Sequence, residues 1–252
     1  MAKKKIILIG ASGLLGKFFL NELSKDKDTA LICAADNNLK TDLKSKSKKF
    51  KLDISNEKEI QKFFKNIKDL YGEFDCLINN AAYTAKMAIK ESTSKKKDYF
   101  DTINWKKNID VNLTGVFLSI KYFFEYHNNK KKLQKIITTG SIYGSNSPDH
   151  SIYDAENFFS SIGYSSTKAG LIGLNKWLSK KFAEQNIRSN ILSPAGVYNN
   201  HTARFLNNYL RNIPLKKMAN QKDVYGVLKF LISNNSDYIN GENIHVDGGY
   251  SA

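Results

Sequence analysis

Arginine, proline and cysteine are scarce in this chain of 252 residues. Only three of its 39 basic residues are arginine, and it has three prolines and two cysteines. Two cysteines with no disulfide framework and no paired metal-ligand spacing argue against a disulfide-stapled secreted domain and favour a reducing, cytoplasmic setting. The four histidines also lack metal-ligand spacing, so we expect no metal site.

The net charge of +15 is carried almost entirely by lysine. Proteins that read nucleic-acid bases favour the planar fork of arginine, which this chain hardly uses. Its lysines are scattered along the sequence, as in LKTDLKSKSKKFK and HNNKKKLQK. We therefore interpret the charge as a solvated surface, with an anionic substrate or partner as the alternative, and we do not expect a nucleic-acid partner.

Long apolar runs are absent as well, so we expect no membrane span. Short apolar segments instead alternate with amphipathic ones. They predict strands at residues 4–10, 30–36, 48–54, 75–80, 134–140, 188–193 and 243–248, and helices at 14–25, 56–71, 99–128, 164–185 and 221–233. This alternation predicts one α/β domain over residues 1–252, a doubly wound parallel sheet of about seven strands with helices on both faces.

Three glycines follow the first predicted strand in GASGLLG. Such glycines allow a tight turn and a close approach of the backbone to a diphosphate, whose charge the following helix N-terminus stabilises. Asp36 ends the second strand, where a carboxylate accepts hydrogen bonds from the adenosine ribose and repels a 2′-phosphate. Lys40 and Lys44, close behind, would partly offset that repulsion. The sequence thus predicts a dinucleotide site that prefers NAD to NADP, with loop contacts from Gly10, Ser12, Gly13, Leu15 and Gly16.

Two later segments suit the same ligand. Asp53 and Ile54 end the third predicted strand, where the Asp53 carboxylate is placed to meet the adenine amino group. NNAA ends the fourth strand, and its small residues allow a close approach of the backbone to the cofactor. The predicted contacts here are Asn80, Ala81 and Ala82.

Motifs along nearly the whole chain resemble those of the short-chain dehydrogenase/reductase family. They are GASGLLG, Asp36, LDI, NNAA, DVNLTGVF, TTGSIYG, YSSTKAGL, LSPAG and INGENIHVDGGYSA, in family order. The resemblance implies a Rossmann-type fold, hydride transfer between a nicotinamide cofactor and an alcohol or carbonyl group, and assembly as a homodimer or homotetramer. The glycine loop departs from the pattern usual at this length, GxxxGxG, because Leu14 stands where the second glycine is expected.

The resemblance also implies roles for single residues. Asn112, Ser141, Tyr164 and Lys168 would form the catalytic set, with Asn112 holding a water that links Lys168 to solvent. Pro194, Gly196 and Val197 would contact the nicotinamide end of the cofactor. Asn199 stands where the family often has threonine, so the Val197 backbone or Asn199 would meet the carboxamide.

The pattern Y-x-x-x-K occurs three times, at Tyr126/Lys130, Tyr164/Lys168 and Tyr225/Lys229. Catalytic groups in an open α/β sheet lie at the carboxyl ends of strands, and only Tyr164 both follows such an end and opens a helix. The ordinary tyrosine pKa of about 10 is too high for a base at neutral pH. A lysine one helical turn later favours the phenolate. We therefore predict that Tyr164 is the general acid/base and that Ser141 stabilises charge on the substrate oxygen.

Ser141 and Tyr164 stand about ten residues further apart than is usual in the family. Tyr153 has the usual spacing from the serine, but Asn157 occupies the position of its lysine. We infer an insertion at 148–160 over the active site and a substrate loop at 194–219. The predicted substrate contacts are Ser141, Tyr143, Tyr153, Tyr164 and Asn199.

The two substrate segments are rich in amide, acidic and aromatic side chains, which suit a sugar or a sugar phosphate. The serine loop, SIYG…P…IY, has a weaker resemblance to oxidoreductases of flagellin modification and sialic-acid-like sugar biosynthesis, and this indicates a carbohydrate pathway. The alternative of another class is a catalytically silent nucleotide-binding regulatory or RNA-binding protein with the same fold.

Overall fold

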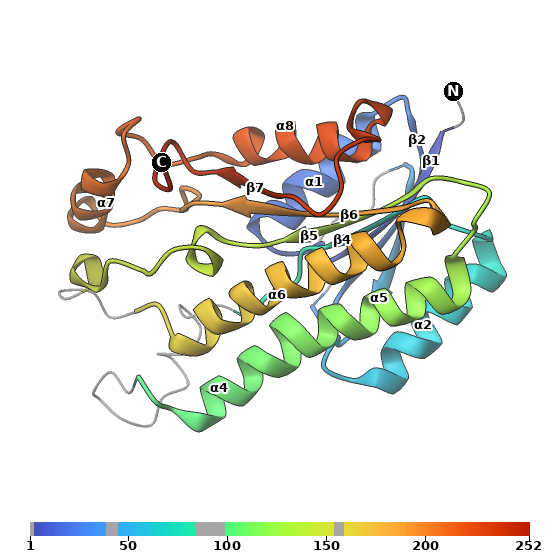
Figure 1. Cartoon of the computed structure of the whole chain (residues 1–252), viewed down its shortest axis with the longest axis horizontal. Helices are drawn as coiled ribbons and strands as arrows, with labels where there is room; N and C mark the ends of the chain where they lie inside the picture. Colours follow the sequence, from blue (N-terminus) through green and yellow to red (C-terminus); the bar gives the residue numbers. More distant parts are fainter. Residues whose placement is uncertain (1–2, 39–44, 84–98, 154–158) are drawn as a thin grey trace.

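A parallel sheet of seven strands forms the centre of the molecule (Figure 1). The computed structural model describes residues 3–38, 45–83, 99–153 and 159–252. The strands follow the order β3-β2-β1-β4-β5-β6-β7, and each neighbouring pair is parallel. Their bounds are β1 Lys4–Ile9, β2 Thr29–Asp36, β3 Ser47–Lys51, β4 Cys76–Asn79, β5 Gln134–Thr139, β6 Ile187–Pro194 and β7 Asn243–Val246. The order in which successive strands join the sheet reverses between β1 and β4, and an open α/β sheet binds its ligand at such a point.

Helices cover both faces of this sheet (Figure 1). α1 (Leu14–Lys25) and α8 (Gln221–Ile232) lie on one face, and α2 (Glu57–Tyr71), α5 (Gly115–His127) and α6 (Ile162–Lys181) lie on the other. These helices divide the core into two clusters of buried apolar side chains. The predicted doubly wound, single-domain Rossmann-type fold is confirmed.

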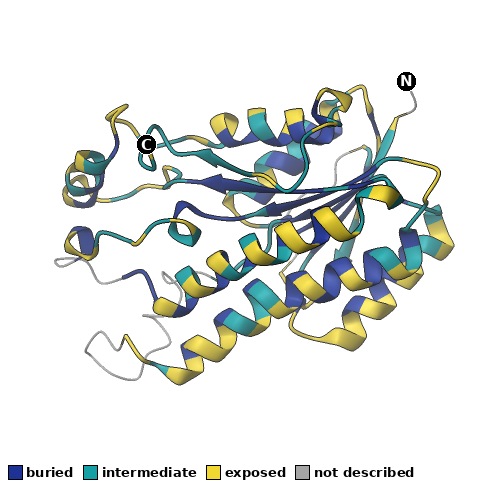
Figure 2. Cartoon of the chain, in the orientation of Figure 1, coloured by how far each residue is buried: buried dark blue, intermediate teal, exposed yellow. Residues whose placement is uncertain are grey.

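Alternate residues of β1 show why the central strands read as unbroken apolar runs. Ile7 and Ile9 belong to the cluster under α2, α5 and α6, whereas Ile6 and Leu8 belong to the cluster under α1 and α8. A strand covered on both faces has no solvent side on which polar residues would alternate. Figure 2 shows the same division, with buried strands between helices whose outer faces are exposed.

Several predicted boundaries differ from the structure. β3 ends at Lys51 rather than at residue 54, because the Asp53 side chain accepts hydrogen bonds from the Ser55 backbone and hydroxyl and turns the chain. The predicted helix 99–128 is one helical run of three parts: α4 (Thr102–Asn108), a π-helical turn η1 (Ile109–Thr114) and α5. α6 begins two residues before Tyr164, so Tyr164 lies in its first turn.

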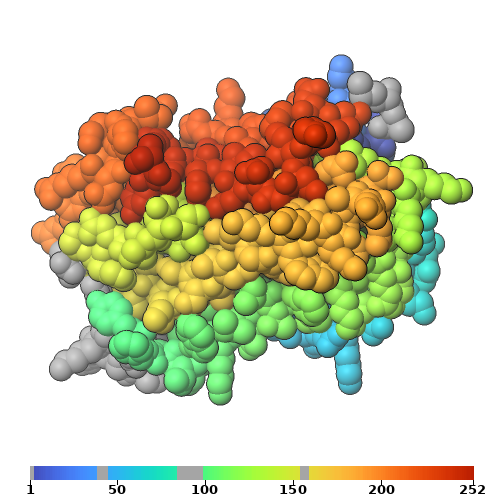
Figure 3. Space-filling view, viewed as in Figure 1, coloured from blue at the N-terminus to red at the C-terminus, as the bar shows by residue number. Residues whose placement is uncertain are grey.

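A third apolar cluster lies beyond the carboxyl ends of the strands. It joins η3 (His150–Tyr153), which is a short 3₁₀ helix, to α7 (Ala203–Tyr209), and neither helix was predicted. Its buried members are Ile152, Tyr153, Phe159, Phe205, Tyr209 and Ile213. Figure 3 shows the segments of η3 and α7 at the same end of the molecule. The described part of the predicted insertion thus packs against the predicted substrate loop; residues 154–158 lie outside the described ranges.

None of the helices in the described ranges has the length and hydropathy that a membrane span requires.

Candidate active site

A cavity of about 690 Å³ opens at the carboxyl ends of the central strands. This volume is within the usual range for small-molecule sites. Most of the residues predicted from the sequence line it. They are Gly10, Ser12, Gly13, Leu15, Asp36, Asp53, Ile54, Asn80, Ala81, Ala82, Ser141, Tyr143, Tyr153, Tyr164, Lys168, Pro194, Gly196 and Val197.

The glycine loop between β1 and α1 fits a diphosphate. Gly10 has a φ of +86°, and a Cβ there would lie 2.3 Å from the Ala81 nitrogen, so only glycine allows this approach. Gly13 is the N-cap of α1 and offers no side-chain cap, which leaves the first N–H groups of the helix open to the cavity. The buried Ser12 Oγ has no hydrogen-bond partner among the described residues. These unused donors suit the oxygens of a bound diphosphate.

Gly16 has a different role from the two glycines before it. It is buried and does not line the cavity, and a Cβ at this position would lie 2.0 Å from the Gly10 carbonyl oxygen. A Cβ at Gly13, by contrast, would meet only that oxygen, at 3.9 Å. Gly16 therefore lets α1 pack closely on the loop, whereas Gly13 keeps space free for a ligand.

Asp36 stands at the end of β2 with its carboxylate held in place. Its Oδ2 accepts a hydrogen bond from the Ser12 backbone at 2.9 Å, and its Oδ1 accepts one from the Asn38 backbone at 3.0 Å. Each oxygen keeps a lone pair for a further donor. The position suits the adenosine ribose hydroxyls, and Asp53 and Ile54 line the same part of the cavity.

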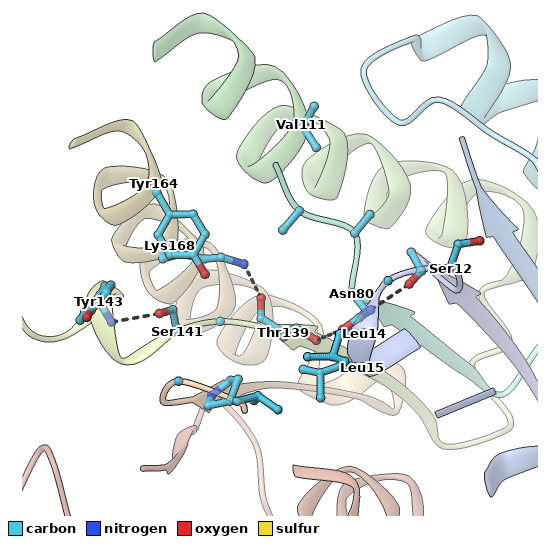
Figure 4. A pocket seen from close by; sticks show the side chains of 18 of the residues that line it. Ser12, Leu14, Leu15, Asn80, Val111, Thr139, Ser141, Tyr143, Tyr164 and Lys168 are labelled. Carbon is cyan, nitrogen blue, oxygen red and sulfur yellow. Dashed lines mark hydrogen bonds between the residues drawn. The ribbon is translucent and has the colours of Figure 1, made fainter. Parts of the chain in front are cut away.

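Ser141, Tyr164 and Lys168 converge at the other end of the cavity (Figure 4). Ser141 Oγ accepts a hydrogen bond from the Tyr143 backbone, and Ser161 Oγ caps α6 by accepting one from the Tyr164 backbone, each at 3.1 Å. Lys168 follows one helical turn after Tyr164, and its Nζ lies 5.6 Å from the centre of the tyrosine ring. The Tyr164 hydroxyl points toward the loop that carries Ser141 (Figure 4).

Burial shifts the pKa of both titratable groups. Desolvation lowers the pKa of the Lys168 ammonium to about 8. It raises the pKa of Tyr164, and the nearby Ser141 hydroxyl opposes this rise. Lys168 is 2% exposed, and no carboxylate forms an ion pair with it within the described ranges. No neighbouring carboxylate in these ranges thus neutralises the ammonium, which lies near the Tyr164 ring.

A chain of hydrogen bonds links Lys168 to the glycine loop (Figure 4). Lys168 Nζ donates to the Thr139 carbonyl at 2.7 Å, and Thr139 Oγ1 donates to Asn80 Oδ1 at 3.1 Å. Asn80 Nδ2 donates in turn to the Gly10 carbonyl at 2.9 Å. The ends of β1, β4 and β5 are thus tied together beneath the cavity.

Asn112 lies behind the cavity rather than in its wall. It is 1% exposed and belongs to the π-helical turn, a distortion that is frequent near functional sites. Its side chain accepts a hydrogen bond from the Tyr83 nitrogen at 2.7 Å and donates one to the Tyr83 oxygen at 3.0 Å. This pairing fixes the chain just after β4, and the water-holding role implied by the family resemblance stays a prediction.

Asn199 is not among the residues that line the cavity. The residue is exposed and lies in a turn that Asn200 completes with a φ of +51°. The turn places His201, rather than Asn199, in the cavity wall. The geometry therefore does not support Asn199 as a substrate contact. The other lining residues of this end fall within the predicted insertion and substrate loop but were not among the predicted contacts; they are Phe159, Ser160, His201, Phe205, Tyr209 and Met218.

Comparisons with known proteins agree with this geometry. A family model described as enoyl-(acyl carrier protein) reductase matches residues 25–251. A 3-oxoacyl-(acyl-carrier-protein) reductase of Buchnera aphidicola is 32% identical, over 98% of this chain and 97% of its own length. The post-translational flagellin modification protein A of Campylobacter coli is 28% identical, over 99% of both chains.

Solved structures of dehydrogenases are also similar to this chain. A short-chain dehydrogenase of Leptospira borgpetersenii with bound NAD+ is 31% identical and superimposes with a TM-score of 0.87, covering 100% of this chain and 94% of that one. A 4-hydroxyisoleucine dehydrogenase in complex with NADH has a TM-score of 0.82 at 24% identity, covering 99% of both chains, a likeness of fold alone. A cavity with a glycine loop and a Ser-Tyr-Lys set on a doubly wound sheet defines a nucleotide-binding oxidoreductase. The chain belongs to the short-chain dehydrogenase/reductase family.

Gly13→Ala and Gly16→Ala should separate ligand binding from packing. We expect Gly13→Ala to keep the melting temperature and to lower NAD+ affinity about tenfold, because its methyl group occupies the diphosphate space. We expect Gly16→Ala to lower the free energy of unfolding by roughly 1–3 kcal/mol, because its Cβ overlaps backbone. Calorimetric titration and urea unfolding measure the two effects. Equal losses of stability in both variants would contradict the assignment.

Proposed function

We propose that this protein is an NAD-dependent oxidoreductase that interconverts an alcohol and a carbonyl group on a sugar or sugar derivative. One observation carries the proposal: Ser141, Tyr164 and Lys168 line the same cavity as the glycine loop and Asp36. A nucleotide-binding protein without turnover would have no need of this catalytic set. The cavity residues therefore favour an enzyme over the silent regulatory or RNA-binding alternative.

A bound nicotinamide cofactor would supply or accept the hydride. Tyr164 would exchange a proton with the substrate oxygen, taking it during oxidation and returning it during reduction. The Lys168 ammonium would offset the desolvation that raises the pKa of Tyr164, because a nearby positive charge favours the phenolate. Ser141 Oγ would donate a hydrogen bond to the same substrate oxygen and stabilise its developing charge.

Tyr164→Phe should lower kcat by roughly 100- to 10,000-fold, because it removes the exchangeable proton and little volume. Binding of NAD+ should change little. Tyr126→Phe is the matched control, since Tyr126 also precedes a lysine by four residues but does not line the cavity. NAD-coupled assays and cofactor fluorescence titration measure both quantities. Near-normal turnover in Tyr164→Phe would refute its role as the acid/base.

The preference for NAD over NADP rests on Asp36. Its fixed carboxylate lies at the cavity wall, where a 2′-phosphate would meet like charge. The Leptospira relative with bound NAD+ supports the same cofactor. Lys40 and Lys44, which would weaken this repulsion, lie outside the described residues.

Asp36→Ser should shift the ratio of NADPH to NADH affinity upward by about tenfold or more, because it removes the repelling charge and the ribose-binding carboxylate together. Fluorescence titration with the two reduced cofactors measures the ratio. Asp69→Asn, at an exposed carboxylate of α2, should leave the ratio unchanged. An unchanged ratio in Asp36→Ser would show that Asp36 does not select the cofactor.

Two candidate substrate classes have specific support. The Campylobacter relative, named for flagellin modification, agrees with a sugar derivative. The Buchnera relative, named as a 3-oxoacyl-(acyl-carrier-protein) reductase, makes a 3-oxoacyl thioester the second candidate. The cavity favours the first, because its substrate end carries several tyrosine and serine hydroxyls that an acyl chain would leave unpaired.

A homo-oligomer is also proposed, formed through α5 and α6. Phe117, Ile162 and Trp177 are between 49% and 59% exposed on these helices, and a Cβ at Gly173 would meet no atom within 4 Å. Exposed apolar side chains beside an open glycine suit contact with a second copy. Light scattering should show Trp177→Glu as a smaller species than the unmodified protein; an equal mass would place the interface elsewhere.

A cytoplasmic location agrees with the two cysteines. Cys33 and Cys76 are free and buried, and burial raises the pKa of each thiol to about 12. Such thiols are unreactive core groups, as a reducing compartment allows. Fractionation of cells with an antibody to the protein would test this location, and recovery in a secreted fraction would contradict it.

A further inference from the structure

Four residues with side-chain hydroxyls line the substrate end of the cavity, and they come from separate parts of the chain. They belong to Tyr143, Tyr153, Ser160 and Tyr209, here called the hydroxyl cluster. Tyr143 follows the catalytic serine, Tyr153 ends η3, Ser160 precedes α6, and Tyr209 ends α7. The hydroxyls of Tyr143 and Tyr153 lie 2.9 Å apart and share a hydrogen bond. Only Tyr143 and Tyr153 were expected from the sequence.

These tyrosines are neutral hydroxyls at physiological pH. Burial raises the pKa of Tyr143 and Tyr209, and nearby Tyr153 raises both further. Burial also raises the pKa of Tyr153 to about 12. They therefore act as hydrogen-bond donors and acceptors rather than as anions, and none of them competes with Tyr164 as a base.

Two members of the hydroxyl cluster hold unused hydrogen-bonding capacity. The Tyr209 oxygen accepts a hydrogen bond from the Gly196 nitrogen at 2.6 Å, but its own proton finds no acceptor in the described ranges. Ser160 is 5% exposed, and its Oγ has no partner among the same residues. Buried donors without acceptors are costly, so a ligand that supplies acceptor oxygens would be favoured here.

Charged side chains are absent from this end of the cavity, as far as the chain is described, apart from Lys168. The other charged lining residues, Lys17, Asp36 and Asp53, belong to the adenosine end, and neither Arg204 nor Arg211 lines the cavity. Apart from the tyrosines, His201 is the remaining titratable residue that lines this end in the described ranges. A phosphate or carboxylate on the substrate would thus find no arginine clamp.

Aromatic faces complete this end of the cavity. His201 stacks on Phe205 at 4.9 Å between ring centres, and Phe205 stacks on Tyr209 at 5.5 Å. The stack fixes the orientation of Tyr209, and Phe205 and Phe159 present apolar surface beside the hydroxyls. A ligand ring with both C–H and O–H groups would contact the apolar faces and the hydroxyls of this wall together.

We propose that the hydroxyl cluster is a subsite for the hydroxyl oxygens of a neutral, polyhydroxylated ring, with Ser160 and Tyr209 as specificity-determining residues. This inference rests on the proposed function and narrows it. The substrate is an unphosphorylated sugar or cyclic polyol rather than a sugar phosphate or an acyl thioester.

The test is a panel of probes assayed with saturating nicotinamide cofactor. It contains neutral aldohexoses and myo-inositol, their monophosphates, cyclohexanol as a ring with one hydroxyl, and acetoacetyl-coenzyme A as the thioester. The unmodified enzyme should have its highest kcat/KM on a neutral member with several hydroxyls. Saturation-transfer NMR on the enzyme–NADH complex should show the same member bound.

Ser160→Ala and Tyr209→Phe should each lower kcat/KM for that best probe roughly three- to tenfold more than for cyclohexanol, mainly through KM. Tyr209→Phe also loses the bond to Gly196, so Ser160→Ala, which has no partner to lose, gives the independent result. Tyr198→Phe is the matched control for Tyr209→Phe, because Tyr198 lies in the same 194–219 segment, is 48% exposed and does not line the cavity. It should leave kcat/KM unchanged both for the best probe and for cyclohexanol.

The outcomes separate this subsite from the proposed oxidoreduction. A best substrate among cyclohexanol, the phosphates or the thioester overturns the subsite and leaves the oxidoreductase function standing. Equal losses on all probes in Ser160→Ala also overturn it. NAD+ binding without reaction on any probe overturns the subsite as well, whereas a failure to bind either cofactor overturns the proposed function too.

Discussion

The cavity depends on the close approach of two backbone segments, at Gly10 after β1 and at Ala81 after β4. Any side chain at Gly10 would overlap the Ala81 nitrogen, so the two strand ends meet only because a Cβ is missing. The approach lets Asn80 accept from Thr139 and donate to the Gly10 carbonyl, and Thr139 in turn holds Lys168. The diphosphate loop and the buried lysine are therefore held at a fixed separation, as a reaction between two bound partners requires.

The buried charge of Lys168 destabilises the folded state in this arrangement. Removing an ammonium from water is unfavourable, and the lowered pKa records that cost. The Thr139 carbonyl compensates part of it without bringing a negative charge, so the field of the lysine still reaches Tyr164. A carboxylate partner would have stabilised the fold more and the phenolate less. The arrangement is less stable than an ion pair would be, but it leaves the positive charge available to Tyr164, the proposed acid/base.

The fold and the cofactor half of the site could be predicted from the sequence because both depend on local signals. Buried strands alternate with helices, and glycine and small residues mark the strand ends where a ligand approaches. The same logic selected Tyr164 among three similar patterns. Tyr209 escaped prediction because it reaches the cavity through the packing of α7 against η3, a contact between segments distant along the chain. Ser160, just before α6, carries no local sequence signal of its own. Asn199 does not line the cavity, because the left-handed Asn200 turns the chain and His201 reaches the wall instead.

The apolar cluster under η3 and α7 is separate from the two clusters that hold helices to the sheet. Substitutions within it would reshape the far wall of the cavity while the strand ends, and the chemistry they support, stay in place. Selection can thus act on ligand choice and on catalysis almost independently. Two relatives have similar identity to this chain, one named as a 3-oxoacyl-(acyl-carrier-protein) reductase and one as a flagellin modification protein. Their different names agree with this separation of ligand choice from catalysis. The segment between Ser141 and Tyr164 contributes η3 to this cluster, so its length bears on the far wall of the cavity and not on the strand ends.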